Sequence, residues 1–224
     1  LVLLIIVVYG AFSLFQSKTG RGKAIAGVAV LASLGILIWS YSSMDPTVEI
    51  LPQIFQQFNP WFIILLTPVF VGFFSWLNSK HKEPSAPRKI GIGMVIAAVG
   101  FMLLAFGSFG LPTPAEVEAN GIAESALVSP NWLISTYLVL TFAELFLSPM
   151  GISFVSKVAP PKYKGMMMGG WFVATAIGNY LVAIIGYLWG GIQLWMVWSV
   201  LIVCCLLSAL FIFSIMKKLE KVAK

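Results

Sequence analysis

Long runs of apolar residues, separated by short polar connections, make up most of this chain. Seven runs approach the length of a membrane span, and they cover residues 1–16, 24–43, 60–78, 90–110, 131–156, 166–189 and 192–216. A helix needs about 20 apolar residues to cross the hydrocarbon of a bilayer. Because the runs are continuous and do not alternate in polarity, they do not fit a transmembrane β-barrel. The pattern predicts an all-α membrane protein with about seven hydrophobic helices.

Composition and charge agree with this interpretation. Hydrophobic residues make up 59% of the 224 residues and charged residues only 10%, whereas about a quarter of the residues in a soluble protein are charged. The net charge of +6 does not indicate a nucleic-acid partner, because the basic residues are spread over several connections. Cys204 and Cys205 are adjacent within an apolar run, a spacing that predicts neither a disulfide nor a metal site.

Basic residues occur in every second connection between the runs. In membrane proteins such connections lie on the cytoplasmic side, so we expect those connections and the C-terminus to be cytoplasmic. The chain begins at Leu1 within an apolar run and lacks the features of a signal peptide, so we expect it to be a fragment of a longer chain. The basic connections carry Lys18, Arg21 and Lys23, then Lys80, Lys82, Arg88 and Lys89, then Lys157, Lys162 and Lys164, and finally the C-terminal lysines.

Glu144 is the one charged side chain placed well inside an apolar run. A carboxylate at this depth costs several kcal/mol unless it faces protein or water, so it marks a candidate functional site. A structural role, as the partner of another buried polar group, is the alternative. At helical spacing Glu144 shares one face with polar and small residues. This polar stripe consists of Tyr137, Thr141, Glu144, Ser148 and Gly151.

The run 166–189 combines two further patterns. Gly170, Ala174 and Gly178 recur every fourth residue, which favours close packing of helices. Trp171, Thr175 and Asn179 lie beside them at the same spacing and predict the wall of a ligand pocket. We expect the tryptophans at 189, 195 and 198 to lie near the outer membrane surface.

Prolines mark helix ends and interruptions. Asn59-Pro60 fits a helix N-cap followed by proline in the first turn. Pro68 and Pro149 lie inside predicted helices, where proline frees a backbone carbonyl and bends the helix. The bend at Pro149, five residues after Glu144, is either a hinge or a static kink, and the sequence favours neither.

Three motifs resemble the proton-coupled oligopeptide transporters of the major facilitator superfamily. Residues 58–64 (FNPWFII) with Pro68 resemble the family's eighth helix, residues 144–153 (ELFLSPMGIS) its tenth, and residues 166–171 (MMMGGW) with 174–181 (ATAIGNYL) its eleventh. The resemblance extends from about Gln53 to Lys218. It implies the C-terminal six-helix bundle of that fold plus an extra linker helix. Residues 1–52 then hold the linker helix and a divergent seventh helix, and residues 53–224 hold helices eight to twelve.

The resemblance also implies a function and a set of site residues. The chain is expected to form one wall of the central site of a symporter for di- or tripeptides and protons, in a multi-pass protein of the bacterial inner membrane. Glu144 takes the peptide amino terminus, Ser148 lies beside it, Asn59 lines the pocket and Trp171 shapes a side-chain pocket. The expected partners are the peptide, protons, the lipid bilayer and the N-terminal bundle, with no enzyme activity, catalytic residue, metal or cofactor.

Two departures from the family pattern keep alternatives open. The N-terminal bundle with its Glu-x-x-Glu-Arg motif is absent, and residues 24–43 lack the Phe-Trp pair and polar residue of the family's seventh helix. Residues 1–43 are therefore either a linker helix plus a divergent seventh helix, or the hairpin that joins the bundles in bacterial members. A scaffold or degenerate fragment without transport, and a transporter of another solute on the same fold, remain alternative functions.

Overall fold

The described part of the chain is almost entirely helical. The computed structural model describes residues 2–17, 19–43, 52–121 and 128–222, and none of these residues is in a β-strand. The chain divides into two compact units, residues 1–83 and residues 84–224. Each unit is described separately below.

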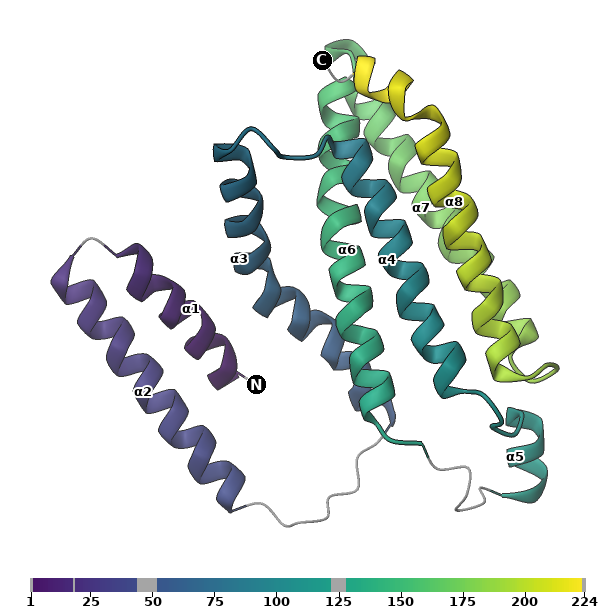
Figure 1. The fold of residues 1–224 in the computed structure, drawn as a ribbon, viewed down its shortest axis with the longest axis horizontal. Helices are drawn as coiled ribbons and strands as arrows, with labels where there is room; N and C mark the ends of the chain where they lie inside the picture. The colour runs from purple at the N-terminus through teal and green to yellow at the C-terminus, as the bar shows by residue number, and fades with distance from the viewer. Residues whose placement is uncertain (1, 18, 44–51, 122–127, 223–224) are drawn as a thin grey trace. The chain divides into compact units, whose positions relative to one another are not determined.

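The first unit contains a helical hairpin and a third helix (Figure 1). α1 (Val2–Gln16) and α2 (Gly20–Ser42) pack against each other, and α3 (Phe58–Ser79) follows the short 3-10 helix η1 (Pro52–Gln57). The two helices of the hairpin approach closely at Gly10 of α1, where an added Cβ would lie 2.6 Å from Cγ2 of Val30. A glycine at this position therefore lets the two helices approach closely.

The predicted N-cap at Asn59 is wrong. α3 begins at Phe58, its N-cap is Gln57 in helical conformation, and the Gln57 side chain makes no capping hydrogen bond. The reason is that η1 leads directly into α3, so the chain has no extended residue at the position where Asn59 would cap the helix. At its other end α3 closes with His81 at φ 54°, and the amides of His81 and Lys82 donate to the carbonyls of Asn78 and Leu77. This is a Schellman motif with a histidine in place of the usual glycine.

The second unit is built around α4 (Ala86–Gly107). α4 lies between α6 (Asn131–Val158) and α8 (Leu194–Val222), while α7 (Lys164–Leu188) contacts α6 (Figure 1). An added Cβ at Gly93 of α4 would lie 2.9 Å from the carbonyl oxygen of Ala143, and one at Gly91 would lie 2.9 Å from the ring of Phe213. Glycines on two faces of α4 thus let both neighbouring helices approach.

Polar contacts join α4 to α8 at both ends. At the start of α4, the hydroxyl of Ser85 donates to Oε1 of Glu220 at 2.6 Å, and Nε of Arg88 lies 2.7 Å from the same oxygen. After the end of α4, the indole N–H of Trp198 donates to the buried Ser108 hydroxyl at 3.0 Å. Trp195 stacks on Phe109. Two of the expected interfacial tryptophans therefore also pack between segments of the protein.

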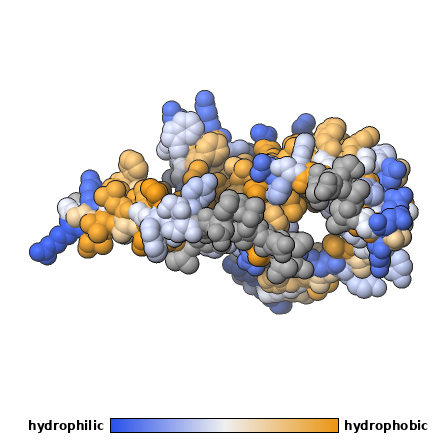
Figure 2. Space-filling model, turned by 90° about the horizontal axis from the view of Figure 1, so that it is seen from below, coloured by the Kyte–Doolittle hydropathy of each residue, from blue (hydrophilic) through white to orange (hydrophobic). Residues whose placement is uncertain are grey.

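The surface is that of a membrane protein. Within the described residues, six helices, all except α1 and α5, are long and apolar enough to cross a bilayer, and α1 is a shorter apolar helix. Many large hydrophobic side chains are exposed along them, and Figure 2 shows broad apolar areas beside hydrophilic ones. The predicted all-α membrane fold is confirmed. The sequence analysis did not predict α5 (Pro114–Asn120), a short helix held by a capping box between Thr113 and Glu116.

Candidate functional site

The polar stripe on α6 divides into positions with different environments. Thr141 is fully buried, and its hydroxyl donates to the carbonyl of Tyr137 at 2.7 Å. Glu144 and Ser148 are half-buried, and Gly151 is buried. Because the Thr141 hydroxyl is bonded within its own helix and shielded from solvent, it is less well placed to meet a ligand than the half-buried side chains of Tyr137, Glu144 and Ser148.

Glu144 lies next to the surface that α6 presents to α4. That surface includes Ala143 and Leu147, which surround the glycine at position 93 of α4. Glu144 is adjacent to both along the helix, at the edge of the packed interface. A carboxylate at such an edge is partly withdrawn from solvent, which agrees with the half-buried state of Glu144.

Trp171 of α7 packs directly on the end of the stripe. An added Cβ at Gly151 would overlap the Trp171 indole, with Cζ2 at 2.7 Å and Cζ3 at 3.1 Å. Trp171 is half-buried, whereas its neighbours Gly170 and Phe172 are exposed. The structure therefore brings Trp171 to within about one helical turn of Ser148, because Gly151 follows Ser148 at a spacing of three.

The rest of α7 makes little contact with the other helices of its unit. Every residue from 172 to 184 is exposed, and half-buried residues occur only toward the two ends, at Met168, Trp171, Ile185 and Leu188. Thr175 donates its hydroxyl to the carbonyl of Trp171 at 3.0 Å. Within the described residues, nothing lies within 4 Å of a Cβ added at Gly170 or Gly178. The close packing predicted for this row of small residues is therefore not found inside the described part of the chain.

Asn179 lies at about the same depth as Glu144. α6 and α7 are joined by the 3-10 helix η3 (Pro161–Tyr163) and run in opposite directions (Figure 1). Counting from the Gly151–Trp171 contact, seven residues back along α6 reach Glu144, and eight forward along α7 reach Asn179. Asn59 belongs to the other compact unit, where it is half-buried in the first turn of α3.

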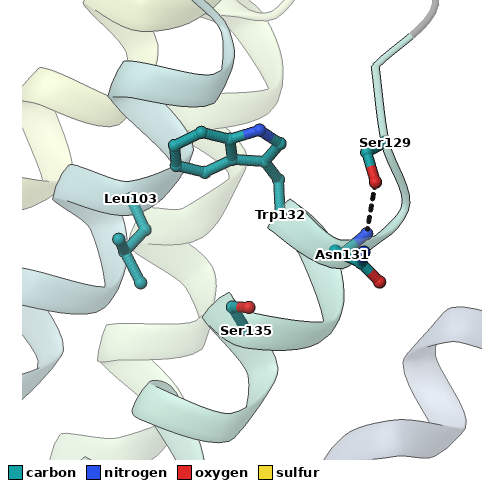
Figure 3. Close-up of a pocket in the computed structure, with 5 residues that line it drawn as sticks. All are labelled: Leu103, Ser129, Asn131, Trp132 and Ser135. Carbon is teal, nitrogen blue, oxygen red and sulfur yellow. Dashed lines mark hydrogen bonds between the residues drawn. The ribbon is translucent and has the colours of Figure 1, made fainter.

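A cavity that the sequence analysis did not predict lies at the start of α6 (Figure 3). It has a volume of about 250 Å³, and none of the predicted site residues lines it. Near its mouth the backbone N–H of Asn131 donates to the Ser129 hydroxyl at 3.4 Å. No sequence pattern indicated this cavity, because α4 and α6 form it together. The lining residues are Leu103, Ser129, Asn131, Trp132 and Ser135.

The described residues contain no group of three or more His, Cys, Asp or Glu side chains that could hold a metal ion. Comparison with known proteins gives the fold and the site their family context. The family model described as PTR2, the POT family, matches residues 30–190. The chain belongs to the POT family.

Similar proteins are transporters rather than enzymes. The peptide transporter YePEPT of Yersinia enterocolitica is 39% identical over 132 residues, which cover 59% of this chain and 24% of that protein. The dipeptide and tripeptide permease A of Citrobacter koseri is 25% identical over 192 residues, covering 79% of this chain and 36% of the permease. This chain thus matches only part of the length of these relatives.

A solved transporter of the POT family shares the fold. The crystal structure of the E310Q mutant of a peptide transporter POT, in complex with alafosfalin, matches 99% of this chain and 46% of its own. The TM-score is 0.67 at 20% sequence identity. The chain spans about half the length of that transporter, and it is an integral, multi-pass membrane protein of the same fold.

Proposed function

We propose that this chain is the C-terminal half of a proton-coupled symporter for di- and tripeptides. It forms one wall of a central site and works by alternating access with an N-terminal bundle of the same protein, because transporters of this kind rock two halves around a site near the midplane. Residues 53–224 supply helices eight to twelve of the transporter, and residues 1–52 supply a linker helix and a divergent seventh helix.

The observation that carries this proposal is the environment of Glu144. Its carboxylate lies half-buried inside a span-length helix, on the same face as Ser148 and the Trp171 contact at Gly151. A carboxylate in a region of low dielectric attracts an ammonium group more strongly than it does in water. We therefore assign Glu144 to the peptide amino terminus, which is the charged group that peptides of different sequence share.

The neighbouring residues complete a site that accepts peptides of different sequence. Ser148, one turn from Glu144, supplies a hydroxyl beside the amino terminus, and Trp171 forms the wall of a pocket for a peptide side chain. Asn59 of α3 is the fourth residue that we assign to the site, because it matches the family's eighth-helix motif. A site that holds the terminus with polar groups and the side chains with apolar surface binds many peptides, because apolar contacts discriminate weakly between side chains.

The distribution of basic residues sets the orientation in the membrane. The connections before α2, before α4 and before α7 carry lysine or arginine, while α5 and its flanking residues carry only acidic charges. By the positive-inside rule the basic connections and the C-terminus face the cytoplasm. The relatives are bacterial, and a bacterial inner membrane is the corresponding location.

The test is peptide-dependent proton influx into liposomes that contain the intact protein, with its N-terminal half. We expect influx with dialanine and a large loss in Glu144→Gln. Glu118→Gln is the matched control, because Glu118 is an exposed acid on α5 and its loss should leave transport unchanged. Peptide uptake without proton influx would contradict the coupling. Absence of peptide uptake would contradict the substrate and favour another solute or a non-transporting scaffold.

A further inference from the structure

We infer that Gly151 is a positioning residue that sets the place of the Trp171 indole and thereby the size of peptide side chain that the site accepts. This inference rests on the proposed function, since it concerns the pocket that Trp171 is proposed to shape. The inference assigns a role to a residue that has no side chain. It rests on the contact between Gly151 of α6 and Trp171 of α7.

The contact leaves no room for a larger residue at position 151. The three ring atoms nearest to an added Cβ are Cη2, Cζ2 and Cζ3 of Trp171, the last two at 2.7 and 3.1 Å. All three belong to the six-membered ring of the indole. Real Cβ atoms do not approach other atoms this closely, so a methyl group at 151 must displace the ring or the helix that carries it.

The place of the displacement follows from the position of Gly151 on α6. Gly151, Ser148 and Glu144 are spaced three and four residues apart and share one helix face. The Cβ of an alanine at 151 would thus project from the face that bears the proposed binding groups. It would displace the indole from its place against Gly151, next to the space beside Ser148 that a peptide side chain is proposed to occupy.

Few contacts hold this part of α7, so the indole can yield to an added methyl group. Met168 and Trp171 are the half-buried residues near the start of α7, and the thirteen residues that follow Trp171 are all exposed. Trp171 is therefore one of the few points at which α7 rests on α6 in the described structure. Its main-chain carbonyl accepts from the Thr175 hydroxyl within the helix.

The first experiment tests the contact without using transport. Thermal unfolding of the purified intact protein is measured for Gly151→Ala, Trp171→Phe and the double variant. A phenylalanine lacks the outer indole atoms that meet the added methyl, so we expect Gly151→Ala to lower the unfolding midpoint and Trp171→Phe to restore most of that loss. Gly178→Ala is the control on α7, where an added Cβ meets none of the described residues within 4 Å. An equal fall in the unfolding midpoint with and without Trp171→Phe would contradict the proposed contact.

The second experiment tests the role in specificity. Uptake of dialanine and of diphenylalanine is compared in the same variants. We expect Gly151→Ala to raise the KM for diphenylalanine by about tenfold while changing that for dialanine little, because a displaced indole obstructs a large side chain more than a methyl group. Trp171→Phe should relieve this selective loss.

The two experiments separate the possible failures. A uniform loss for both peptides that Trp171→Phe does not relieve would overturn the inference and leave Gly151 a packing residue only. If the wild-type protein takes up neither peptide, the proposed function fails, and the pocket role fails with it, while the unfolding data still decide whether Gly151 seats Trp171.

Discussion

The indole of Trp171 lies against Gly151, so that α7 meets α6 at the end of the face that carries Glu144 and Ser148. This contact joins two patterns on consecutive helices: the polar stripe of α6 and the row Trp171, Thr175 and Asn179 of α7. It places an aromatic wall about one turn from a hydroxyl and two turns from a carboxylate. Such a mixture of one charge, one hydroxyl and apolar surface is typical of a small-molecule site.

Glu144 should recognise the free amino terminus of the peptide. Acetylating that terminus removes its positive charge, so we expect the acetylated peptide to bind the wild-type transporter at least about tenfold more weakly, because losing one member of a desolvated charge pair costs 2 kcal/mol or more. In Glu144→Gln the same modification should change binding little. Competition of each peptide for uptake measures both values. Equal effects of acetylation in both proteins would contradict this assignment.

The sequence predicts the helices well because the length and composition of each apolar run are enough to identify it as a helix. The run 131–156 becomes α6 (Asn131–Val158), and 166–189 becomes α7 (Lys164–Leu188). The spacing of Glu144, Ser148 and Gly151 is likewise local, and a helix turns such spacing directly into a shared face. These features need no knowledge of which helices are neighbours.

Features that depend on neighbouring segments were not predicted. The small size of Gly151 suggests close contact, but only the fold shows that Trp171 fills the space. The burial of Thr141 depends on its neighbours in the fold, although its spacing made it look like a binding residue. Asn59 failed as an N-cap because a 3-10 turn precedes it. Its role in lining the peptide site stays a prediction.

Gly93 should be necessary for the packing of α4 on α6. An alanine there would place its methyl 2.9 Å from the carbonyl oxygen of Ala143 and 3.1 Å from Cβ of Phe146. Backbone atoms cannot move aside easily, so we expect Gly93→Ala to lower the free energy of unfolding by about 1–3 kcal/mol. Unfolding of the intact protein in detergent measures it. Gly72→Ala is the control, because nothing lies within 4 Å of that position in the described residues. A Gly93→Ala variant as stable as this control would contradict the close approach.

Glu220 should hold the end of α8 to the start of α4. Its carboxylate accepts from the Ser85 hydroxyl at 2.6 Å and pairs with Arg88 at 2.7 Å. The Arg88 side chain is 58% exposed, so the ion pair alone contributes little. The hydrogen bond to a charged group contributes more. We therefore expect Glu220→Ala to cost about 1 kcal/mol of unfolding free energy and Arg88→Ala to cost less. A larger loss for Arg88→Ala would show that the ion pair dominates.

His81 should be replaceable by glycine with a gain in stability. It closes α3 at φ 54°, a left-handed conformation that costs a residue with a Cβ about 1 kcal/mol and costs glycine almost nothing. The hydrogen bonds of His81 and Lys82 to the last carbonyls of α3 use only backbone atoms, so glycine preserves them. We expect His81→Gly to raise the unfolding free energy by up to about 1 kcal/mol and His81→Val to lower it, since a β-branched residue tolerates this conformation poorly. Thermal unfolding of both variants measures the difference. The opposite order would mean that the imidazole makes a contact worth more than the backbone strain.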